Sequence, residues 1–359
     1  MIFFMNITAQ TGLWVLLFRH SEVTMIFSRR MIYFGDTVPY YEGGSPKMMA
    51  SIRYGSNKYK YLLAVTEDAN KWYVVKGFSD VTYNHKLGVI YNKPMFYCMT
   101  KDYAKYTTNG KDWFDIGLPG THTVATLYSG CKALYFANNK YIMLISPTEV
   151  YQSTDLQTWT ATAYTFNNAA AADASLSVYP KWGGGNYYYA IFRVSSKSTV
   201  YRSTNGLSWT QIGVNNMYSF SGISCDTKGF MLAWGYVAVS QTTKKFSNLY
   251  YKNYSTSYTS LSANIVHSSG PNNAGYVYMR IKQPDDSYIH YKASTSAMAT
   301  QTALSTTGIY SGYANQLDLF YTGNTSSPKY SRDLVTETAF DFSEIVGSEP
   351  VGYTVIAAL

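Results

Sequence analysis

Three arginines carry the side chain best suited to holding a carboxylate: Arg53, Arg193 and Arg280. A guanidinium group forms two parallel hydrogen bonds to one carboxylate, so several of them brought together would make a strong site for an acidic group. The three lie far apart in the sequence, each in a different apolar segment. Only a fold that brings those segments together could make the arginines converge.

Acidic residues that could serve catalysis are sparse. Asp102, Glu149, Asp285 and Asp286 are the acids nearest to the predicted strands, and the last pair lies in an exposed Gln-Pro-Asp-Asp-Ser stretch typical of a turn. No Gly-x-Ser-x-Gly nucleophile elbow, phosphate-binding P-loop or Gly-x-Gly-x-x-Gly dinucleotide loop is present. We therefore expect no catalytic residue.

The metal-binding residue types also lack a recognisable pattern. Cys98, Cys131 and Cys225 have no ligand spacing, and an odd number of cysteines cannot form a complete disulfide framework. The five histidines are isolated from one another: His20, His85, His122, His267 and His290. The sequence thus predicts buried free thiols, no metal site and no cofactor.

The composition favours strands and turns. Tyrosine accounts for 37 of 359 residues, aromatic residues for 17% and charged residues for only 14%. The net charge of +8 is spread along the chain, and only Arg29-Arg30 and Lys244-Lys245 are adjacent basic pairs. Because nucleic-acid-binding proteins usually cluster their basic residues, we expect no nucleic-acid partner.

A short unit recurs along the chain, with a hydroxyl residue, an Asp or Asn two positions later and a tryptophan four positions after that. Glycine follows the Asn in two copies. The four clear copies are Thr66, Asp68 and Trp72; Thr107, Asn109, Gly110 and Trp113; Ser153, Asp155 and Trp159; and Ser203, Asn205, Gly206 and Trp209. A weaker fifth copy runs from Ser240 to Phe246, and degenerate copies are placed at Ser294 to Thr300 and Ser331 to Phe340.

The spacing of the aromatic anchors indicates the fold. Trp72, Trp113, Trp159, Trp209 and Phe246 are separated by 41, 46, 50 and 37 positions. A four-stranded propeller blade needs about 40 to 50 residues. The Asp or Asn accepts backbone hydrogen bonds in the turn, and the aromatic ring then packs between neighbouring blades, so each copy is expected to be a structural staple.

A second repeated element, a turn between two apolar runs, precedes the anchors. It occurs at Asn57, Asn92, Asn139, Gly185-Asn186, Lys228-Gly229, Ala274-Gly275 and, more faintly, Asn315. Apolar runs that flank Asn or Gly are typical of hairpins. Seven hairpins predict an all-β protein with a single β-propeller of about seven four-stranded blades, six being possible.

The ends of the chain complete the predicted organisation. Residues 1–45 form an apolar N-terminal extension, anchoring or ring-closing, and residues 46–359 form the propeller. The apolar stretch from Met1 to Phe18 has no basic segment before it and is too short to span a membrane. The strand that closes the ring is either Met31 to Phe34 or Val351 to Ile356.

The repeated unit resembles the Asp-box, or BNR, repeats of the sialidase-like propeller superfamily, in which a hydroxyl residue, Asp, Gly and an aromatic residue lie on a hairpin turn. The resemblance covers Arg53 to about Phe340, although the unit is one residue shorter and Asn often replaces Asp. It implies a propeller like those of phage tail-associated or other virion surface proteins. For an enzyme of this superfamily it implies an arginine triad, which Arg53, Arg193 and Arg280 could supply.

Three functions remain open at this stage. The first is a non-catalytic virion or surface attachment protein that binds a receptor glycan, with Trp182, Tyr187, Trp234 and the three arginines as candidate contacts. The second is a sialidase-like glycoside hydrolase, which the scarcity of acids disfavours. The third is a purely structural propeller that docks with neighbouring virion proteins through its N-terminus. All three place the protein on a virion tail or appendage, or outside the cell.

Overall fold

The computed structural model describes residues 38–359 except 56–59, 79–83, 91–92, 147–148, 167–171, 180–186, 195–196, 213–219, 226–230, 239–243, 252–258, 261–264, 286, 306–308, 324 and 348–350. Before residue 38 it describes the backbone of four short strands, β1 (Asn6–Ala9), β2 (Gly12–Val15), β3 (Phe18–Arg19) and β4 (Glu22–Val23). The described part is almost entirely β-structure, which confirms the predicted all-β class.

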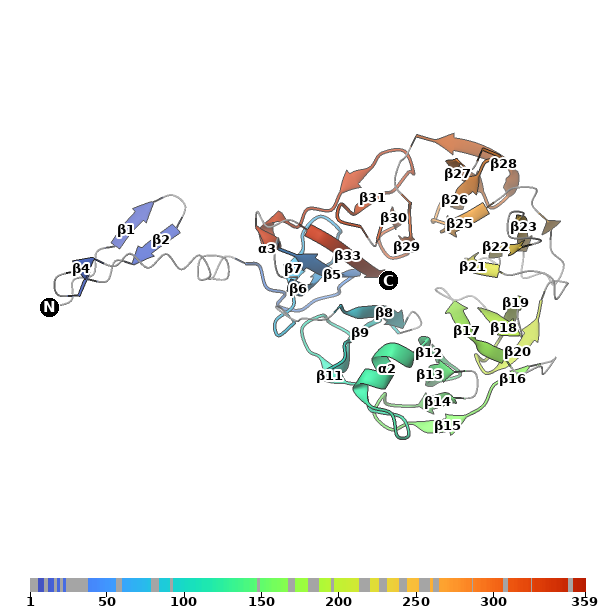
Figure 1. Cartoon of the computed structure of the whole chain (residues 1–359), viewed down its shortest axis with the longest axis horizontal. Coiled ribbons are helices and arrows are strands. Elements are labelled where there is room, and N and C mark those ends of the chain that lie inside the picture. The colour runs from blue at the N-terminus through green and yellow to red at the C-terminus, as the bar shows by residue number, and fades with distance from the viewer. Residues whose placement is uncertain are drawn as a thin grey trace.

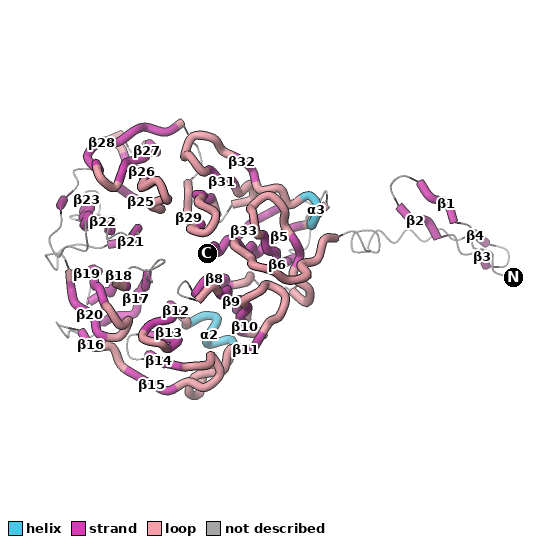
Figure 2. The backbone as a smooth tube through the Cα atoms, turned by 180° about the vertical axis from the view of Figure 1, so that it is seen from behind, coloured by secondary structure: helices cyan, strands magenta, loops and turns pink. Residues whose placement is uncertain are grey.

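Seven antiparallel sheets stand around a common axis, so that the chain forms a β-propeller (Figure 1). Six sheets have four strands, and the seventh has a fifth strand added in parallel at its outer edge. The prediction of about seven blades is confirmed in the described part of the chain. Seen from behind, the same ring of sheets surrounds the axis (Figure 2).

Within each blade the strands run in sequence from the axis outwards, except in blade 1, whose inner strand comes from the C-terminus. Blade 1 contains β33 (Val351–Ala358), β5 (Met48–Tyr54), β6 (Lys60–Thr66) and β7 (Tyr73–Val74). Blade 2 contains β8 (Lys86–Ile90), β9 (Met95–Met99), β10 (Ala104–Thr107) and β11 (Phe114–Asp115). Blade 3 contains β12 (Ala133–Ala137), β13 (Lys140–Ser146), β14 (Glu149–Ser153) and β15 (Thr160–Thr162).

The remaining blades follow the same order. Blade 4 contains β17 (Ala172–Tyr179), β18 (Tyr188–Val194), β19 (Lys197–Ser203), β20 (Ser208–Gln211) and the added β16 (Thr165–Phe166). Blade 5 contains β21 (Phe220–Cys225), β22 (Met231–Ala238), β23 (Lys244–Tyr251) and β24 (Thr259–Ser260). Blade 6 contains β25 (Ile265–Ser269), β26 (Tyr276–Lys282), β27 (Tyr288–Ser294) and β28 (Ala297–Leu304). Blade 7 contains β29 (Gly312–Ala314), β30 (Leu319–Tyr321), β31 (Lys329–Ser331) and β32 (Thr338–Ala339).

The C-terminal strand closes the ring. β33 pairs antiparallel with β5, from Val351 opposite Tyr54 to Ala358 opposite Met48. Of the two predicted candidates, the segment around Val351 to Ile356 therefore supplies the closing strand, while Met31 to Phe34 lies outside the described residues. Closure removes an unpaired sheet edge at the first blade, which is the usual solution in this kind of fold.

This closure also explains the position of the first predicted hairpin. Three of the predicted turns lie in the described part of the chain, at Asn139, Ala274-Gly275 and Asn315, and each joins the first and second strands of its blade. The other four, at Asn57, Asn92, Gly185-Asn186 and Lys228-Gly229, lie outside the described residues. In blade 1 the strands on either side of Asn57, β5 and β6, are the second and third, because the first strand of that blade is β33. At the blade 3 turn Asn138 and Asn139 both have positive φ, 49° and 57°, as tight hairpins require.

The hydrophobic core lies between neighbouring blades. Side chains alternate along each strand, so one face of a blade packs on the preceding blade and the other on the following one. In β5, Ile52 joins Phe340 in the cluster between blades 7 and 1. Met49, on the opposite face of β5, joins Phe96 in the cluster between blades 1 and 2. The ring is therefore held by blade-to-blade packing.

The repeated unit forms one defined turn between the third and outer strands of a blade, called here the Asx box. Its hydroxyl oxygen accepts backbone N–H groups, as when Gly206 N donates to Ser203 Oγ at 2.8 Å. Its Asp or Asn oxygen accepts N–H groups two and three positions later, as when Ser208 N donates to Asn205 Oδ1 at 2.8 Å. The predicted turn chemistry is confirmed for the four clear copies.

The residue after the Asp or Asn has positive φ in every described Asx box. Gly110 and Gly206 adopt 72° and 77°, which glycine accepts without strain. Ala69, Leu156 and Leu334 adopt 70°, 64° and 61°, a region that residues with a Cβ atom rarely occupy. The hydrogen bonds of the box hold these residues in that conformation.

Some Asx boxes form hydrogen bonds with the preceding blade. Tyr135 of blade 3 donates its hydroxyl to the carbonyl of Gly206 in the blade 4 box, at 2.8 Å. Gly117 N, which follows the outer strand of blade 2, donates to the carbonyl of Leu156 in the blade 3 box, also at 2.8 Å. The predicted role as a staple is therefore seen in backbone contacts as well as in aromatic packing.

The box tryptophans differ in how deeply they are buried. Trp209 is fully buried, and Trp72 packs edge-on against Phe340 and Phe342 at centroid distances of 5.5 and 5.1 Å. Trp113 is half-buried and lies 4.5 Å from the ring of Phe78. Burial between blades is thus complete in two boxes and partial in the others.

The weaker predicted copies have different outcomes. The fifth is wrong in position, because Phe246 lies inside β23, the third strand of blade 5, and does not follow it. Ser240 lies outside the described residues. The sixth, Ser294 to Thr300, does lie at the turn between the third and outer strands of blade 6. The seventh contains a full Asx turn: Asp333 Oδ1 accepts N–H groups from Val335 and Thr336 at 2.8 and 2.7 Å.

The segment that leads into the ring lies along the outer edge of blade 1. Val74 N donates to the carbonyl of Pro39, and Tyr41 N donates to that of Val74, both at 2.9 Å. The hydroxyl of Tyr41 donates to Glu67 Oε1 at 2.6 Å. The described part of the predicted extension, residues 38–45, thus packs on the propeller.

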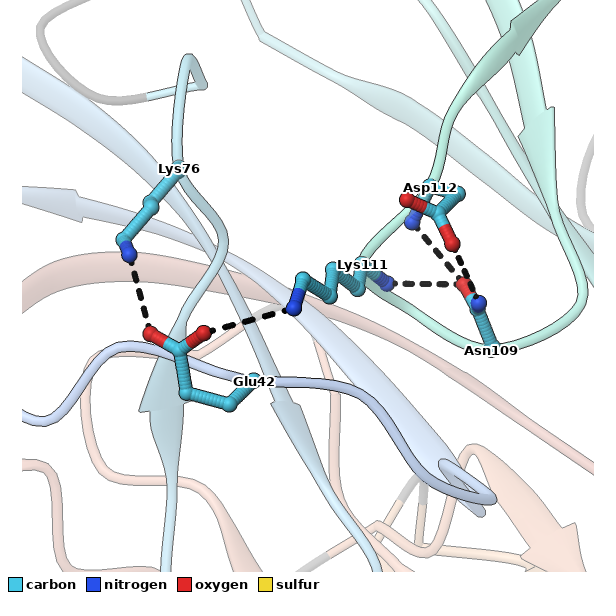
Figure 3. A network of polar contacts seen from close by, with 5 residues as sticks. All are labelled: Glu42, Lys76, Asn109, Lys111 and Asp112. Carbon is cyan, nitrogen blue, oxygen red and sulfur yellow. Dashed lines mark hydrogen bonds and ion pairs between the residues drawn. The ribbon is translucent and has the colours of Figure 1, made fainter.

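An exposed polar network joins this segment to the blade 2 box (Figure 3). Glu42 pairs with Lys76 at 2.9 Å and with Lys111 at 3.5 Å. Lys111 lies in the box turn, where Asn109 Oδ1 accepts its backbone N–H and that of Asp112. Because these groups are exposed, we assign the network a role in orienting the segment and little net stability.

Helices are few in the described residues. α2 (Val124–Gly130) begins with a capping box formed by Thr123 and Thr126, and α3 (Ser343–Val346) precedes the closing strand. No described helix is long and apolar enough to cross a membrane. Cys98 and Cys131 are buried free thiols, as predicted, and the described residues contain no group of three potential metal ligands.

Candidate functional site

The three arginines occupy equivalent places in their blades, near the end of the second strand. Arg53 lies in β5, Arg193 in β18 and Arg280 in β26. Arg53 shares a strand face with Met49, which packs on blade 2, and Arg280 shares one with Tyr278, which packs on blade 7. The side chain of Arg193 lies outside the described residues. Arg53 and Arg280 thus face two different blade interfaces, and the described residues do not form an axial arginine cluster.

The predicted aromatic contacts are also separated. Trp234 is 6% exposed and packs between blades 5 and 6, so its burial assigns it to the core. Tyr187 is half-buried beside blade 4, with the guanidinium of Arg202 4.4 Å from its ring centre. Trp182 lies outside the described residues. Among these three residues, Tyr187 alone presents a described ring that is partly exposed.

The acids nearest to the strands belong to turns and strand ends. Asp102 lies in the turn between β9 and β10, where its N–H donates to Thr100 Oγ1. Asp285 accepts hydrogen bonds from the N–H and hydroxyl of Ser287 in an exposed turn. Glu149 begins β14 and lies 3.7 Å from His122. Asp286 lies outside the described residues.

One face of blade 6 gathers cationic and aromatic side chains. Along β26, Val277, Met279 and Ile281 pack on blade 5, so the alternating residues face blade 7. The same alternation holds in β27, where Tyr291 and Ala293 belong to the core with blade 5. The opposite set defines the blade 6 face: Tyr276, Tyr278, Arg280 and Lys282 from β26, and Tyr288, His290 and Lys292 from β27.

Blade 7 covers this face only in part. Its strands have three, three, three and two residues, whereas those of blade 6 have five, seven, seven and eight. Tyr278, in the middle of β26, is fully buried against Tyr310 and Phe320. Tyr276 and Tyr288, at opposite ends of the face, are 41% and 43% exposed. The mismatch in strand length therefore leaves the two ends of the blade 6 face open.

At one end, a guanidinium group is stacked on an exposed aromatic ring. The Cζ atom of Arg280 lies 3.8 Å from the centre of the Tyr288 ring. Arg280 forms no ion pair with any described residue, and its Nε atom is buried without a hydrogen-bond partner there. This arrangement combines a flat apolar surface with a positive charge.

Two histidines flank Arg280 on the neighbouring strands. Arg280 pairs with His267 of β25 on one side and with His290 of β27 on the other. Burial lowers the pKa of His267, and the nearby charge of Arg280 lowers it further, although its hydrogen bond to the carbonyl of Tyr310 at 2.9 Å opposes this. His290 Nδ1 lies 2.7 Å from the hydroxyl of Tyr278, whose pKa is raised by burial. At neutral pH, Arg280 thus supplies the permanent charge in this row.

At the other end of the face a lysine lies over an exposed tyrosine ring, at a greater distance. Lys292 Nζ lies 5.3 Å from the centre of the Tyr276 ring. Tyr276 lies six positions along β26 from Lys282, the residue opposite Tyr288, so the backbones of the two tyrosines are about 20 Å apart along the strand. The two ends are therefore separate places on one surface.

Sequence reasoning selected Arg280 but missed Tyr288, Tyr276 and the histidines beside them. The signal lies in the alternation of Tyr276 to Lys282, where aromatic or basic residues alternate with Val277, Met279 and Ile281. That pattern predicts one apolar and one polar face. It does not show that blade 7 is too short to cover the polar face, because that depends on the lengths of strands elsewhere.

Comparison with solved structures shows what the ring is similar to. The BP39L lectin from Burkholderia pseudomallei superposes with a TM-score of 0.51 at 9% sequence identity, over 83% of this chain and 99% of the lectin. YCF48 from Cyanidioschyzon merolae reaches a TM-score of 0.49 at 14% identity, over 76% of this chain and 88% of its own. The WD40 β-propeller domain of Doa1 reaches 0.44 at 11% identity, over 84% and 91%.

The shared feature is the propeller. At these identities the similarity shows the fold alone. No family model matches the chain, and no curated protein matches it. The function has to be argued from the site.

Proposed function

We propose that this protein is a non-catalytic attachment propeller that binds carbohydrate at the Tyr288 end of the blade 6 face. The observation that carries the proposal is the exposed Tyr288 ring, 43% accessible and backed by Arg280 at 3.8 Å. Sugar rings pack their apolar faces on aromatic rings, while nearby polar groups hydrogen-bond their hydroxyl groups. The similarity of the ring to a lectin is consistent with this use but supports only the scaffold.

Binding is favoured over hydrolysis by the separation of the arginines. Arg53 and Arg280 face different blade interfaces. Of the described acids near the blade 6 face, Glu337 is engaged by Lys329 at 2.8 Å, and Asp285, in the turn between β26 and β27, accepts hydrogen bonds from Ser287. A sialidase-like hydrolase uses a tyrosine nucleophile in place of one of the usual two carboxyl groups, and its arginines must converge on the carboxylate of the substrate. Of the predicted arginines whose side chains are described, the blade 6 face carries only Arg280, so it offers a recognition surface without that cluster.

A glycan array on the purified full chain tests the proposal. We expect a defined set of glycans to be bound by the wild-type protein and lost in Tyr288→Ala. Tyr276→Ala is the matched control, because Tyr276 is almost equally exposed and lies at the opposite end of the same face. Absence of any bound glycan, or equal binding by Tyr288→Ala, would contradict the proposal.

We also propose that the Asx boxes relate the chain distantly to the Asp-box repeats of the sialidase-like superfamily. The support is the shared turn, with a hydroxyl residue, an Asp or Asn, a residue of positive φ and a following tryptophan in four blades. The family comparison provides no match. A profile built from sequences that align with this chain tests the relationship, because it would have to recover the box at the same turn of each blade.

The setting that we propose is a virion tail or appendage, or another extracellular surface assembly, where residues 1–45 attach the propeller to neighbouring proteins. The low fraction of charged residues and the apolar start of the chain support this setting. A chain starting at Met31 is the test: we expect a soluble propeller that still binds glycan but no longer joins the assembly. Normal assembly by that chain would overturn the anchoring role.

A further inference from the structure

The guanidinium group of Arg280 has a ring contact but no described anion bound to it. Arg280 makes its contact with the ring of Tyr288 and forms no ion pair in the described part of the chain, and its Nε atom is buried without a hydrogen-bond partner. Leaving a partly buried charged group without an anion is costly, so a site of this kind gains energy when an anion binds. The proposed carbohydrate site therefore has an electrostatic preference.

The groups facing Arg280 strengthen this preference. His267 on β25 has a lowered pKa and uses Nε2 to bind the carbonyl of Tyr310. Glu337 of blade 7 is engaged by both Lys329, at 2.8 Å, and the hydroxyl of Tyr310, at 3.3 Å. Asp285, in the turn between β26 and β27, accepts hydrogen bonds from the N–H and hydroxyl groups of Ser287. The described carboxylates near this end of the face thus have other partners, and none of them forms an ion pair with Arg280.

The geometry of a stacked guanidinium fixes what it can bind. When its plane lies over an aromatic ring, its N–H groups point outwards past the edge of that ring, where a planar carboxylate can accept two hydrogen bonds. A sugar that lies against the exposed part of Tyr288 would place an attached carboxylate near this edge. The ring and the charge would then recognise two parts of the same molecule.

We propose that the ligand of this site is a carbohydrate that carries a carboxylate, with the carboxylate held by Arg280 and the sugar ring packed on Tyr288. This inference rests on the proposed carbohydrate-binding function. It narrows the ligand from glycans in general to acidic ones. Hydrogen bonds to charged groups are worth enough to give an acidic sugar an advantage of about 10- to 100-fold in affinity over its neutral counterpart.

Titration calorimetry with matched acidic and neutral pairs tests the inference. The probes are oligomers of galacturonic, mannuronic and glucuronic acid and 3′-sialyllactose, each compared with its own methyl ester, which keeps the skeleton and removes the charge. We expect at least one acid to bind about 10-fold or more tightly than its ester, and this advantage to fall as salt is raised.

Variants separate the charge from the stacking. Arg280→Met should abolish the preference for the acid while leaving weak binding of both members of the pair. Arg280→Lys should retain only part of the preference, because an ammonium group cannot bind a carboxylate through two parallel bonds. Tyr276→Ala should bind like the wild type, and melting curves of each variant confirm that the ring is folded.

The possible failures are distinguishable. If the wild-type protein binds sugars but no acid in the panel binds more tightly than its ester, the acidic ligand is wrong while carbohydrate binding stands. If neither acids nor esters bind and the glycan array is blank, both proposals fall. A preference that survives unchanged in Arg280→Met would remove Arg280 from the site and overturn the inference.

Discussion

The hydroxyl of Tyr330 donates to Asn70 Oδ1 at 2.9 Å, across 260 positions of the sequence. Tyr330 belongs to the third strand of blade 7, and Asn70 lies in the Asx box of blade 1. The contact therefore joins the last blade to the first at the rim, while β33 joins them near the axis. The hydrogen bond between Tyr135 and Gly206 has the same arrangement, because in both a tyrosine hydroxyl of one blade donates to the Asx box of the next blade.

Tyr330→Phe should weaken this closure without changing the fold. Removing one hydrogen bond of this kind costs about 0.5–1.5 kcal/mol of unfolding free energy, which denaturant titration can measure. A double-mutant cycle with Asn70→Ala isolates the contact, because the two changes should not be additive. Tyr276→Phe, at an exposed ring, is the control and should be close to neutral. Additive effects in the cycle would show that the bond contributes nothing.

Deleting residues 351–359 should open the ring at blade 1. The inner edge of β5, which is paired with β33 over most of its length, would then be unpaired, and exposed strand edges promote aggregation. We expect a lower melting temperature and higher-order species in size-exclusion chromatography. Deletion of residues 1–30 provides the comparison and should leave a monodisperse propeller. A C-terminally truncated chain as stable as the wild type would refute closure by β33.

The box tryptophans should differ in their contribution to stability. Trp209 is fully buried between blades 3 and 4, so Trp209→Ala should cost about 3–5 kcal/mol of unfolding free energy. Trp113 is half-buried, so Trp113→Ala should cost clearly less. Denaturant unfolding followed by circular dichroism measures both. Equal losses would mean that the two rings do not differ in packing as their burial indicates.

The acidic boxes should make stability depend on pH at the acid end. In the blade 7 box, burial alone would raise the pKa of Asp333, but hydrogen bonds from Thr336 and Val335 outweigh it and lower the pKa to about 2. The unfolded value is about 3.9, so the contribution is complete above about pH 4 and is lost as pH falls towards 2. Unfolding measured along this range should show that Asp333→Asn loses less stability than the wild type.

The blade 4 box allows the reverse experiment. Asn205 makes the same backbone contacts without a titratable group, so Asn205→Asp should keep the turn at neutral pH and increase the loss of stability below pH 4. Both changes exchange Asn and Asp at equivalent positions, so each serves as the control of the other. An unchanged acid profile in both variants would mean that the box carboxylates do not control acid unfolding.

Much of the ring could be predicted from the sequence because its information is local. The Asx box places its hydroxyl residue and its Asp or Asn two positions apart, and the side chains of Ser203 and Asn205 bond to each other and to backbone groups within five residues. Hairpin turns such as Asn138-Asn139 are equally local. Such signals survive in a single sequence, and four boxes and seven hairpins were enough to predict the blades.

The features that failed depend on non-local structure. Ser240 to Phe246 has the residue types of a box, yet Phe246 lies inside β23 and pairs with Tyr236 of β22. Trp234 was predicted as a glycan contact, but its side chain is buried in the core between blades 5 and 6. Tyr288 was not singled out because its exposure follows from the short strands of blade 7. Exposure is set by neighbouring blades, which the local pattern does not encode.

A crystal structure of the full chain with its best-binding acidic saccharide tests the central claim most directly. The account predicts a sugar ring packed on the exposed part of Tyr288, with its carboxylate within hydrogen-bonding distance of the Arg280 guanidinium. A saccharide bound at the propeller axis, at Tyr187 or anywhere else that leaves Tyr288 and Arg280 untouched would contradict it.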